Sequence, residues 1–260
     1  MHSDLLQARV NPEAHTTDPA PLLLNVQGLN AWYGAAHILH DIDLALPRGR
    51  VVALMGRNGA GKSTTLKSLM GLVARRSGQV IFMGRDISRL EPHQIARLGL
   101  GYVPEDRRIF TELTVLQNLE TGRQPARIWP GGEPAVHWTP ETLFDLFPNL
   151  AAMQHRPGGA MSGGEQQMLT IARTLMGNPF ALLLDEPSEG VAPVIVEQMA
   201  DMIVRLKEKG VSILLSEQNI HFARLVADQA YVLEKGVIRY HGSMDDLIAN
   251  ETLRRDYLAL

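Results

Sequence analysis

A glycine-rich segment from Gly56 to Thr64 constrains this chain more than any other feature. It reads GRNGAGKST and fits the phosphate-binding pattern G-x-x-x-x-G-K-[ST]. The apolar run Val51–Met55 before it predicts a buried strand, and the pattern after it predicts a helix over Lys62–Ala74. Glycines between a strand and a helix let backbone N–H groups face phosphate oxygens at the positive end of the helix dipole. The alternative is a glycine-rich turn that matches by chance, and the flanking strand and helix argue against it.

The P-loop, as we call this segment, predicts specific contacts with a nucleoside triphosphate. Lys62 is placed to reach the β and γ phosphates and to assist their transfer, and Ser63 is placed to ligate Mg²⁺. The predicted ligands are therefore a nucleoside triphosphate and Mg²⁺. The predicted nucleotide-binding residues of the loop are Gly56, Arg57, Asn58, Gly59, Ala60, Gly61, Lys62, Ser63 and Thr64.

A second strand ends in two carboxylates. The segment Ala181–Glu186 reads ALLLDE, and its four apolar residues are typical of a buried parallel strand. Ligands bind at the carboxyl edge of such a sheet, so Asp185 is predicted to hold Mg²⁺ through water and Glu186 to polarise the attacking water as a general base. Taken alone, the segment also fits a strand that ends in a solvated turn. The P-loop upstream favours the catalytic interpretation.

The pattern along the chain alternates between short β-rich runs and longer helical ones, which predicts an α/β fold. A middle region, about 91–157, is more helical and is interrupted by a Pro- and Gly-rich loop over Gln124–Pro140. Further predicted strands are Leu22–Val26, Ile42–Leu46, Ala181–Leu184 and Ser212–Ser216, with a terminal hairpin of Ala230–Leu233 and Val237–His241; the later predicted helices are Pro193–Lys209 and His221–Val226.

Composition limits the classes of function. The 260 residues are 45% hydrophobic, which suits a large domain with a subdomain, and the formal charge of −3 offers no basic face for nucleic acid. The chain has no cysteine, so it forms neither disulfides nor thiolate metal sites. No apolar run approaches the roughly 20 residues of a membrane-spanning helix. The first 21 residues lack the apolar core of a secretory signal, and we expect them to be a flexible extension.

A third motif leads to a family. The segment Met161–Gln167 reads MSGGEQQ and resembles the LSGGQ signature of the ATP-binding cassette family. Two glycines before a helix form an anion-binding N-terminus, which agrees with the role of that signature, although a Ser-Gly-Gly helix cap is the simpler alternative. In the family, the signature of one cassette closes over the γ-phosphate held by another, so hydrolysis needs a head-to-tail dimer. The residues that the resemblance places at the nucleotide are Ser162, Gly163, Gly164 and Glu165.

The resemblance covers residues 22–260 and implies a fold. It implies a P-loop NTPase domain of the ABC type, with a mainly parallel core sheet, an N-terminal antiparallel β subdomain and a helical subdomain over about 91–177. Tyr33, just before Gly34, matches the aromatic residue that stacks on adenine in the family. A lone tyrosine is otherwise more often a packing residue.

Three positions depart from the family pattern. Glu105 replaces the glutamine of the Q-loop, where a water-mediated Mg²⁺ contact is still expected. Gln218 replaces the switch histidine; it can donate a hydrogen bond to the γ-phosphate but carries no imidazolium charge. The D-loop, Ser188–Val191, lacks its usual final aspartate, which leaves its contact across the dimer open.

These departures form a pattern of their own. Together with the segments around them, Glu105 and Gln218 make the sequence similar to the LivF-type ATPases of branched-chain amino acid importers. The similarity implies a peripheral protein at the cytoplasmic face of the membrane, bound to two permease subunits, supplied indirectly by a periplasmic solute-binding protein and paired with a second ATPase. It favours a heterodimer over a homodimer, and it makes residues 107–122 the expected dock for a permease. The solute is a branched-chain amino acid or a related small molecule.

Two other classes compete with this interpretation. A soluble cassette ATPase of translation or DNA repair usually has two cassettes in one chain or a long coiled-coil insertion, and this sequence shows neither. A regulatory subunit that binds nucleotide with little turnover is compatible with Glu105 and Gln218. Glu186 argues for hydrolysis, because a subunit without turnover has no need of a general base.

Overall fold

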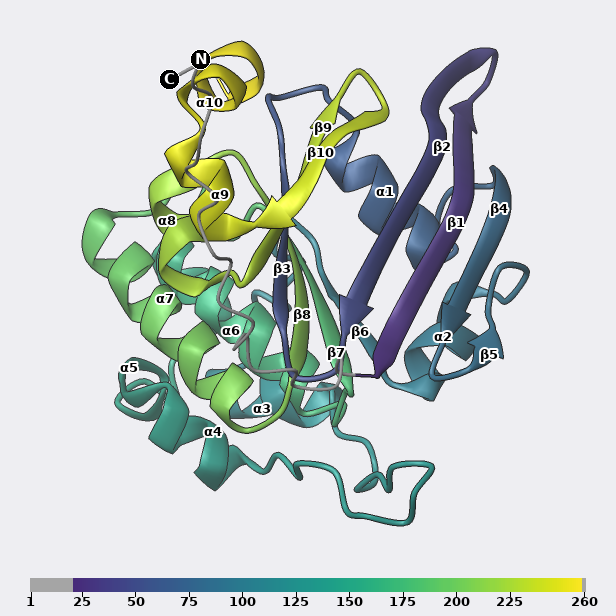
Figure 1. Ribbon diagram of the computed structural model, residues 1–260. Coiled ribbons are helices and arrows are strands. Elements are labelled where there is room, and N and C mark those ends of the chain that lie inside the picture. The colour runs from purple at the N-terminus through teal and green to yellow at the C-terminus, as the bar shows by residue number, and fades with distance from the viewer. Residues whose placement is uncertain (1–20, 259–260) are drawn as a thin grey trace, which may run out of the picture.

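The computed structural model describes residues 21–258 and arranges them in layers (Figure 1). An antiparallel sheet lies on one side, a larger mixed sheet lies in the centre, and helices cover the far face of the central sheet. The flexible extension expected over residues 1–21 falls almost wholly outside the described residues. None of the helices within 21–258 is long and apolar enough to cross a membrane.

The antiparallel sheet has four strands in the order β2-β1-β4-β5. The two long strands are β1 (Leu22–Tyr33) and β2 (Ala36–Pro47), and the others are β4 (Arg75–Phe82) and β5 (Arg85–Asp86). The predicted strands Leu22–Val26 and Ile42–Leu46 form parts of these longer ones. Beyond Val26, β1 continues through Gly28, whose φ of 58° accompanies a shift in strand register.

The central sheet has six strands in the order β10-β9-β3-β8-β7-β6. All neighbouring strands are parallel except the hairpin of β9 and β10. Every residue of β3, β7 and β8 is buried, as expected of strands covered on both faces. The mainly parallel core sheet is therefore confirmed. Its strands are β3 (Val51–Met55), β6 (Leu100–Val103), β7 (Ala181–Asp185), β8 (Ser212–Glu217), β9 (Gln229–Glu234) and β10 (Val237–Ser243).

The helices predicted over Pro193–Lys209 and His221–Val226 begin and end close to those positions, whereas the helix predicted after the P-loop is shorter than expected. Helix α1 ends at Leu69 rather than at the predicted Ala74, because the chain turns at Gly71 with a φ of 74°. The helices are α1 (Lys62–Leu69), α2 (Pro92–Leu98), α3 (Val115–Thr121), α4 (Pro140–Leu146), α5 (Pro148–Ala151), α6 (Gly163–Leu175), α7 (Pro193–Glu208), α8 (Ile220–Val226), α9 (Met244–Ala249) and α10 (Glu251–Leu258), with a 3₁₀ turn at Gly158–Ala160.

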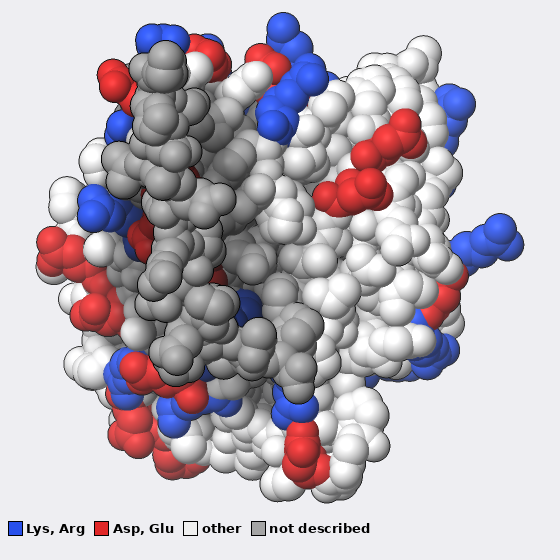
Figure 2. Space-filling model, in the orientation of Figure 1, with Lys and Arg blue, Asp and Glu red and all other residues white. Residues whose placement is uncertain are grey.

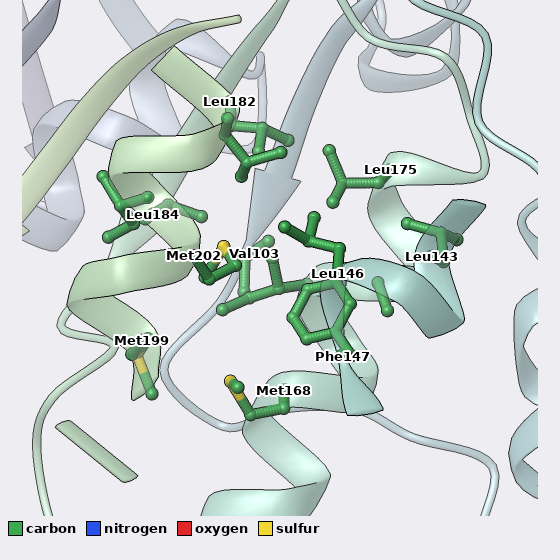
Figure 3. Packing of buried hydrophobic residues seen from close by; sticks show 14 of the residues in the cluster. Val103, Leu143, Leu146, Phe147, Met168, Leu175, Leu182, Leu184, Met199 and Met202 are labelled. Atoms are coloured by element: carbon green, nitrogen blue, oxygen red, sulfur yellow. The ribbon is translucent and has the colours of Figure 1, made fainter. Parts of the chain in front are cut away.

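Two large apolar clusters fill the spaces between the layers. One joins the antiparallel sheet and α1 to one face of the core sheet. The other joins helices α3 to α8 to the opposite face, and its members include Phe147, Met168, Leu182 and Leu184 (Figure 3). Each buried side chain of this size contributes about 1.5–3 kcal/mol through burial of apolar surface. These clusters hold the carboxyl ends of the core strands in place beneath the P-loop.

The middle region departs from a purely helical pattern. Strand β6 falls within the 91–177 range predicted for the helical subdomain, but it pairs with β7 of the core sheet. The boundary of that subdomain stays a prediction. The Pro- and Gly-rich loop predicted over Gln124–Pro140 joins α3 to α4, and its one β-bridge links Ile128 to Pro134.

The turn between β9 and β10 ties three segments together. The N–H of Gly236 donates to the carbonyl of Ala60 in the P-loop at 2.8 Å, and its own carbonyl accepts from the N–H of His40 on β2 at 2.8 Å. Gly236 has a φ of 76°, and an added Cβ there would lie 1.9 Å from the carbonyl oxygen of Ile38. The close contact between the backbone of Gly236 and the carbonyl of Ile38 therefore requires a residue without a side chain.

Charge does not gather on the face of the molecule that includes β1 and β2. Figure 2 shows Lys, Arg, Asp and Glu interspersed there, and the surface over the two strands is largely uncharged. Such a mixed surface produces no strong field of either sign.

Candidate nucleotide-binding site

The P-loop forms the centre of the site. It follows β3 directly, and its last residues, Lys62 to Thr64, begin α1. Within the loop, Gly59 and Gly61 have φ angles of 80° and 112°. Nζ of Lys62 folds back over the loop and donates to the carbonyl of Gly56 at 2.7 Å and to that of Arg57 at 3.2 Å. The lysine thus lies inside the loop, where a β or γ phosphate would replace these carbonyls as its partners.

Lys62 also reaches the end of β7. Its Nζ lies 3.1 Å from Oε1 of Glu186, and the two side chains are only 2% and 9% exposed. Glu186 has a φ of 46°, a conformation that costs a non-glycine residue about 1 kcal/mol or more. Its N–H donates to the backbone carbonyl of Ser216 at 3.1 Å, which keeps this conformation in place. The predicted general base is therefore directed into the P-loop.

Asp185 is held by three hydroxyl groups. Ser63 Oγ donates to Oδ1 at 2.9 Å and Ser216 Oγ donates to the same oxygen at 2.7 Å. Tyr102, on β6, donates to Oδ2 at 3.0 Å. A hydroxyl and an adjacent carboxylate are hard oxygen ligands of the kind that Mg²⁺ prefers, so Ser63 and Asp185 fit the metal predicted for them. Burial and the carboxylate of Asp185 raise the pKa of Tyr102 well above its usual range, so Tyr102 stays a donor.

The D-loop carries a second carboxyl group beside the general base. A hydrogen bond with Glu186 is the main reason that the pKa of Glu189 rises from its ordinary value of 4.5 to about 7. Partial burial and the nearby charges of Glu186 and Glu105 act in the same direction, and Lys62 opposes them. Glu189 therefore keeps its proton to a pH near neutral.

The switch position lies next to the D-loop. Gln218 follows β8, and it lines a cavity of about 390 Å³ together with Glu186, Ser188 and Asn219. Glu217, just before it, is buried and accepts hydrogen bonds from the N–H groups of both loops. Burial raises the pKa of Glu217, and the N–H groups of Ser188 and Asn219 counteract part of that rise.

Two further predicted residues lie at the margin of the site. Tyr33 is the last residue of β1 and is 49% exposed, so its ring is accessible for stacking. Glu105 is exposed in the turn after β6, and its charge reaches Glu189. The roles of both toward adenine and Mg²⁺ stay predictions.

The signature segment begins α6. Ser162 caps this helix, since its Oγ accepts from the N–H of Glu165 while its own N–H donates to Oε2 of Glu165 at 2.7 Å. These two reciprocal hydrogen bonds form the helix cap named above as the simpler alternative. The cap leaves the N–H groups of Gly163 and Gly164 at the N-terminus of the helix. The guanidinium of Arg107 lies against Gly163, where an added Cβ would be 2.7 Å from Nη1. The hydrogen bonds of Ser162 and Glu165 are local to this helix and not to the P-loop of the same chain.

Three residues of the site were not predicted from the sequence. Tyr102 and Ser216 hold Asp185, and Glu217 joins the D-loop to the switch position. All three lie at or near the carboxyl ends of strands β6 and β8, which flank β7. Polar residues that follow apolar strands at this edge of a parallel sheet are the signal that points to them.

Comparison with known proteins identifies relatives over almost the whole chain. The model of the family described as ABC transporter matches residues 39–189. The high-affinity branched-chain amino acid transport ATP-binding protein BraG of Pseudomonas aeruginosa is 39% identical over 91% of this chain and 99% of its own length. The probable branched-chain amino acid transport ATP-binding protein LivF of Archaeoglobus fulgidus is 36% identical over 90% and 97%. The lipopolysaccharide export system ATP-binding protein LptB of Escherichia coli K12 is 33% identical over 90% and 96%.

Solved structures show the same fold. A nucleotide-free ATP-binding cassette from an ABC transporter superposes with a TM-score of 0.74 and 25% identity, over 90% of this chain and 97% of that one. The ADP conformation of another cassette of an ABC transporter gives a TM-score of 0.75 and 26% identity, over 91% and 98%. The overall fold is thus shared with ATP-binding cassettes of ABC transporters.

Proposed function

The chain belongs to the ABC transporter family and is an ATPase of that family, and we propose that it energises the uptake of a branched-chain amino acid or a related small solute. The family match and the aligned relatives confirm the resemblance seen in the motifs. The proposal about the solute draws on the two relatives with the highest identities quoted above, both of which are named for branched-chain amino acid transport. Glu105 and Gln218, the departures typical of the LivF type, support the same assignment.

The single observation that carries the hydrolytic role is the contact between Lys62 and Glu186 inside the P-loop. When a nucleotide occupies the loop, its phosphates take over Lys62 and release the Glu186 carboxylate toward the attacking water. Ser63 and Asp185 would hold Mg²⁺, which neutralises charge on the phosphates. The protein then contributes positioning and electrostatic stabilisation and forms no covalent bond with the substrate.

The site is completed by a second cassette. The signature glycines of α6 lie at a helix N-terminus, and their hydrogen bonding leaves them available to phosphate oxygens of a nucleotide held elsewhere. We assign that nucleotide to the P-loop of a partner ATPase, with this chain's own P-loop facing the partner's signature. A heterodimer with a second ATPase fits the LivF-like sequence, and a homodimer is the alternative.

A groove on the described surface fits a permease. It has a volume of about 640 Å³ and is lined by apolar residues that include Phe110 and by basic residues that include Arg97, Arg108 and Arg173. Nη1 of Arg173 is buried without a hydrogen-bond partner among the described residues. Four of its lining residues, Arg108, Phe110, Thr121 and Gly122, belong to the 107–122 segment expected to dock a permease. A permease helix seated there would place this chain peripherally at the cytoplasmic face of the membrane, where a solute-binding protein acts on the permeases from the other side.

The ATPase assignment is tested by Glu186→Gln in the assembled transporter. We expect Mg²⁺-dependent ATP hydrolysis at this site to fall by at least about 10²-fold while ATP binding is retained, because the amide keeps the size of the side chain but accepts no proton. The matched control is Glu197→Gln on the exposed face of α7. Unchanged turnover in the Glu186 variant would show that hydrolysis occurs only at the partner site.

The solute is tested separately. Membrane vesicles that contain the complete transporter should take up labelled leucine, isoleucine or valine when ATP is supplied, and the Glu186→Gln transporter should not. Uptake of urea, an amide or an aromatic acid instead would support the assignment as an importer and would change the proposed solute. Hydrolysis without uptake of any of these would contradict the proposed transport role.

A further inference from the structure

Glu217 is a buried carboxylate that the mechanism above does not use. It is the last residue of β8, it is 2% exposed, and no lysine or arginine among the described residues forms an ion pair with it. A buried charge without a counter-ion is costly unless hydrogen bonds compensate it. The compensation here comes from backbone N–H groups, and their positions indicate what the side chain does.

The two carboxylate oxygens of Glu217 serve two different loops. Oε1 accepts from the N–H of Ser188 in the D-loop at 3.1 Å. Oε2 accepts from the N–H groups of Gln218 and Asn219 in the switch loop, each at 3.1 Å. One side chain thus spans the gap between two segments that lie about thirty residues apart in the sequence.

Both loops carry groups of the proposed reaction. Ser188 follows Glu186 by two residues, so the position of the D-loop fixes the main chain next to the general base. Gln218 is the residue expected to donate to the γ-phosphate, and it shares a cavity of about 390 Å³ with Glu186 and Ser188. The side chain of Asn219 caps α8, so the switch loop is also fixed at its far end.

The structure assigns Glu217 as a positioning residue that holds the D-loop and the switch loop in fixed positions relative to each other. Glu186 and Gln218 then both face the same phosphate. This assignment rests on the proposed ATPase reaction. Only a carboxylate provides two acceptor oxygens at once and no donor. Bonds from N–H groups to a charged acceptor are also about twice as strong as neutral ones, which favours a fixed geometry.

The test is Glu217→Gln in the assembled transporter. The amide keeps the shape of the side chain, but one of its two ends becomes an NH₂ group that faces N–H donors, so one of the two loops loses its acceptor. We expect kcat to fall by about 10-fold or more, the KM for ATP to change by less than about 3-fold, and the permeases to stay bound. Equal kcat values in the variant and the native transporter would overturn the assignment.

Asp228→Asn is the matched control. Asp228 also accepts from a backbone N–H, that of Val51 at 2.9 Å, but it lies at the opposite end of the sheet from the site. Unlike Glu217, it also forms ion pairs with Arg50 and Lys207, so its change removes a stabilising carboxylate at a place away from the P-loop. We expect a lower melting temperature with kcat retained. A kcat loss in this variant equal to that of Glu217→Gln would show that any loss of stability slows hydrolysis, and the assignment would fall.

A double-mutant cycle with Gln218→Ala asks whether Glu217 acts through the switch loop. If it does, the loss in kcat for the double variant is smaller than the product of the two single losses, because the second change removes a group that is already misplaced. Multiplicative losses would overturn the coupling. If Glu217→Gln does not fold, Glu217→Asp takes its place in the cycle, since it keeps both oxygens on a shorter stem.

Failure of the proposed function gives a different result. If the native transporter hydrolyses no ATP while Glu217→Gln leaves its nucleotide binding intact, the ATPase proposal fails first. Loss of coupling between Glu217 and Gln218 in an active native transporter removes the positioning role alone.

Discussion

Nζ of Lys62 lies 3.1 Å from Oε1 of Glu186, and both side chains are almost fully buried. This ion pair joins the residue proposed to bind phosphate to the residue proposed to activate water. The contribution of the pair can be tested directly.

Lys62→Ala should abolish ATP binding and also lower stability. Removing one member of a buried pair leaves the other charge uncompensated, at a cost of about 3 kcal/mol or more. Thermal denaturation of the nucleotide-free chain measures the second effect, and equilibrium binding of a labelled ATP analogue measures the first. Lys67→Ala, on the partly exposed side of the same helix, should change neither by a comparable amount. A stable Lys62 variant would contradict the stabilising role of the pair.

Tyr102→Phe should weaken the Mg²⁺ dependence of ATP hydrolysis. The change removes only the hydroxyl that donates to Oδ2 of Asp185, and a hydrogen bond to a charged group contributes about 1.5 kcal/mol or more. We expect the Mg²⁺ concentration for half-maximal activity to rise by about tenfold. Tyr231→Phe is the control, since its hydroxyl accepts from the N–H of Ala45 on β2, away from the metal site. Identical Mg²⁺ titrations for Tyr102→Phe and the native protein would exclude a role in orienting Asp185.

Glu189→Gln should flatten the pH dependence of stability in the nucleotide-free protein. The folded chain holds the Glu189 proton with a pKa of about 7, against an ordinary value of 4.5. The folded state therefore binds this proton more tightly than the unfolded state, so its contribution is complete below about pH 4.5 and is lost as the pH rises through about 7. Melting temperatures across this range measure the slope, which should be smaller in the variant. The effect is modest because Glu189 is exposed. A slope in the variant equal to that of the native protein would contradict the role of Glu189.

Gly236→Ala should be far more destabilising than Gly84→Ala. Both glycines have a φ of 76°, so an alanine at either position costs about 1–2 kcal/mol in backbone strain. An added Cβ at Gly84 meets nothing within 4 Å, whereas at Gly236 it would lie 1.9 Å from the carbonyl oxygen of Ile38. The difference between the two free energies of unfolding isolates the steric term, which we expect to exceed about 2 kcal/mol. Equal losses would mean that β2 shifts away at little cost.

The sequence predicted the parts of the site that are local in the chain. The strand, P-loop and helix from Val51 onward follow from adjacent residues, and so does the acidic end of β7. Contacts between neighbouring strands were missed, because Tyr102 and Ser216 reach Asp185 only once β6, β7 and β8 lie side by side. Their order in the sheet is a property of topology and not of any single segment.

Strand β4 was missed for a different reason. Its first five residues read RRSGQ and are mostly exposed, so they lack the alternation of apolar residues that marks a strand. Pairing with β1 holds it in place. The terminal helices α9 and α10 were not predicted either; they pack against the β9–β10 hairpin through few apolar side chains, which include Met244, Leu247 and Leu258.

The turn at Gly236 has a mechanical consequence. Through one residue, backbone hydrogen bonds join the P-loop to the hairpin and the hairpin to β2. These three segments are therefore expected to move together. A displacement of the P-loop would be transmitted to strands of both sheets. Layers that meet only through apolar side chains, as in the cluster of Figure 3, lack such a hydrogen-bonded link, and packed side chains can slide past one another by small steps.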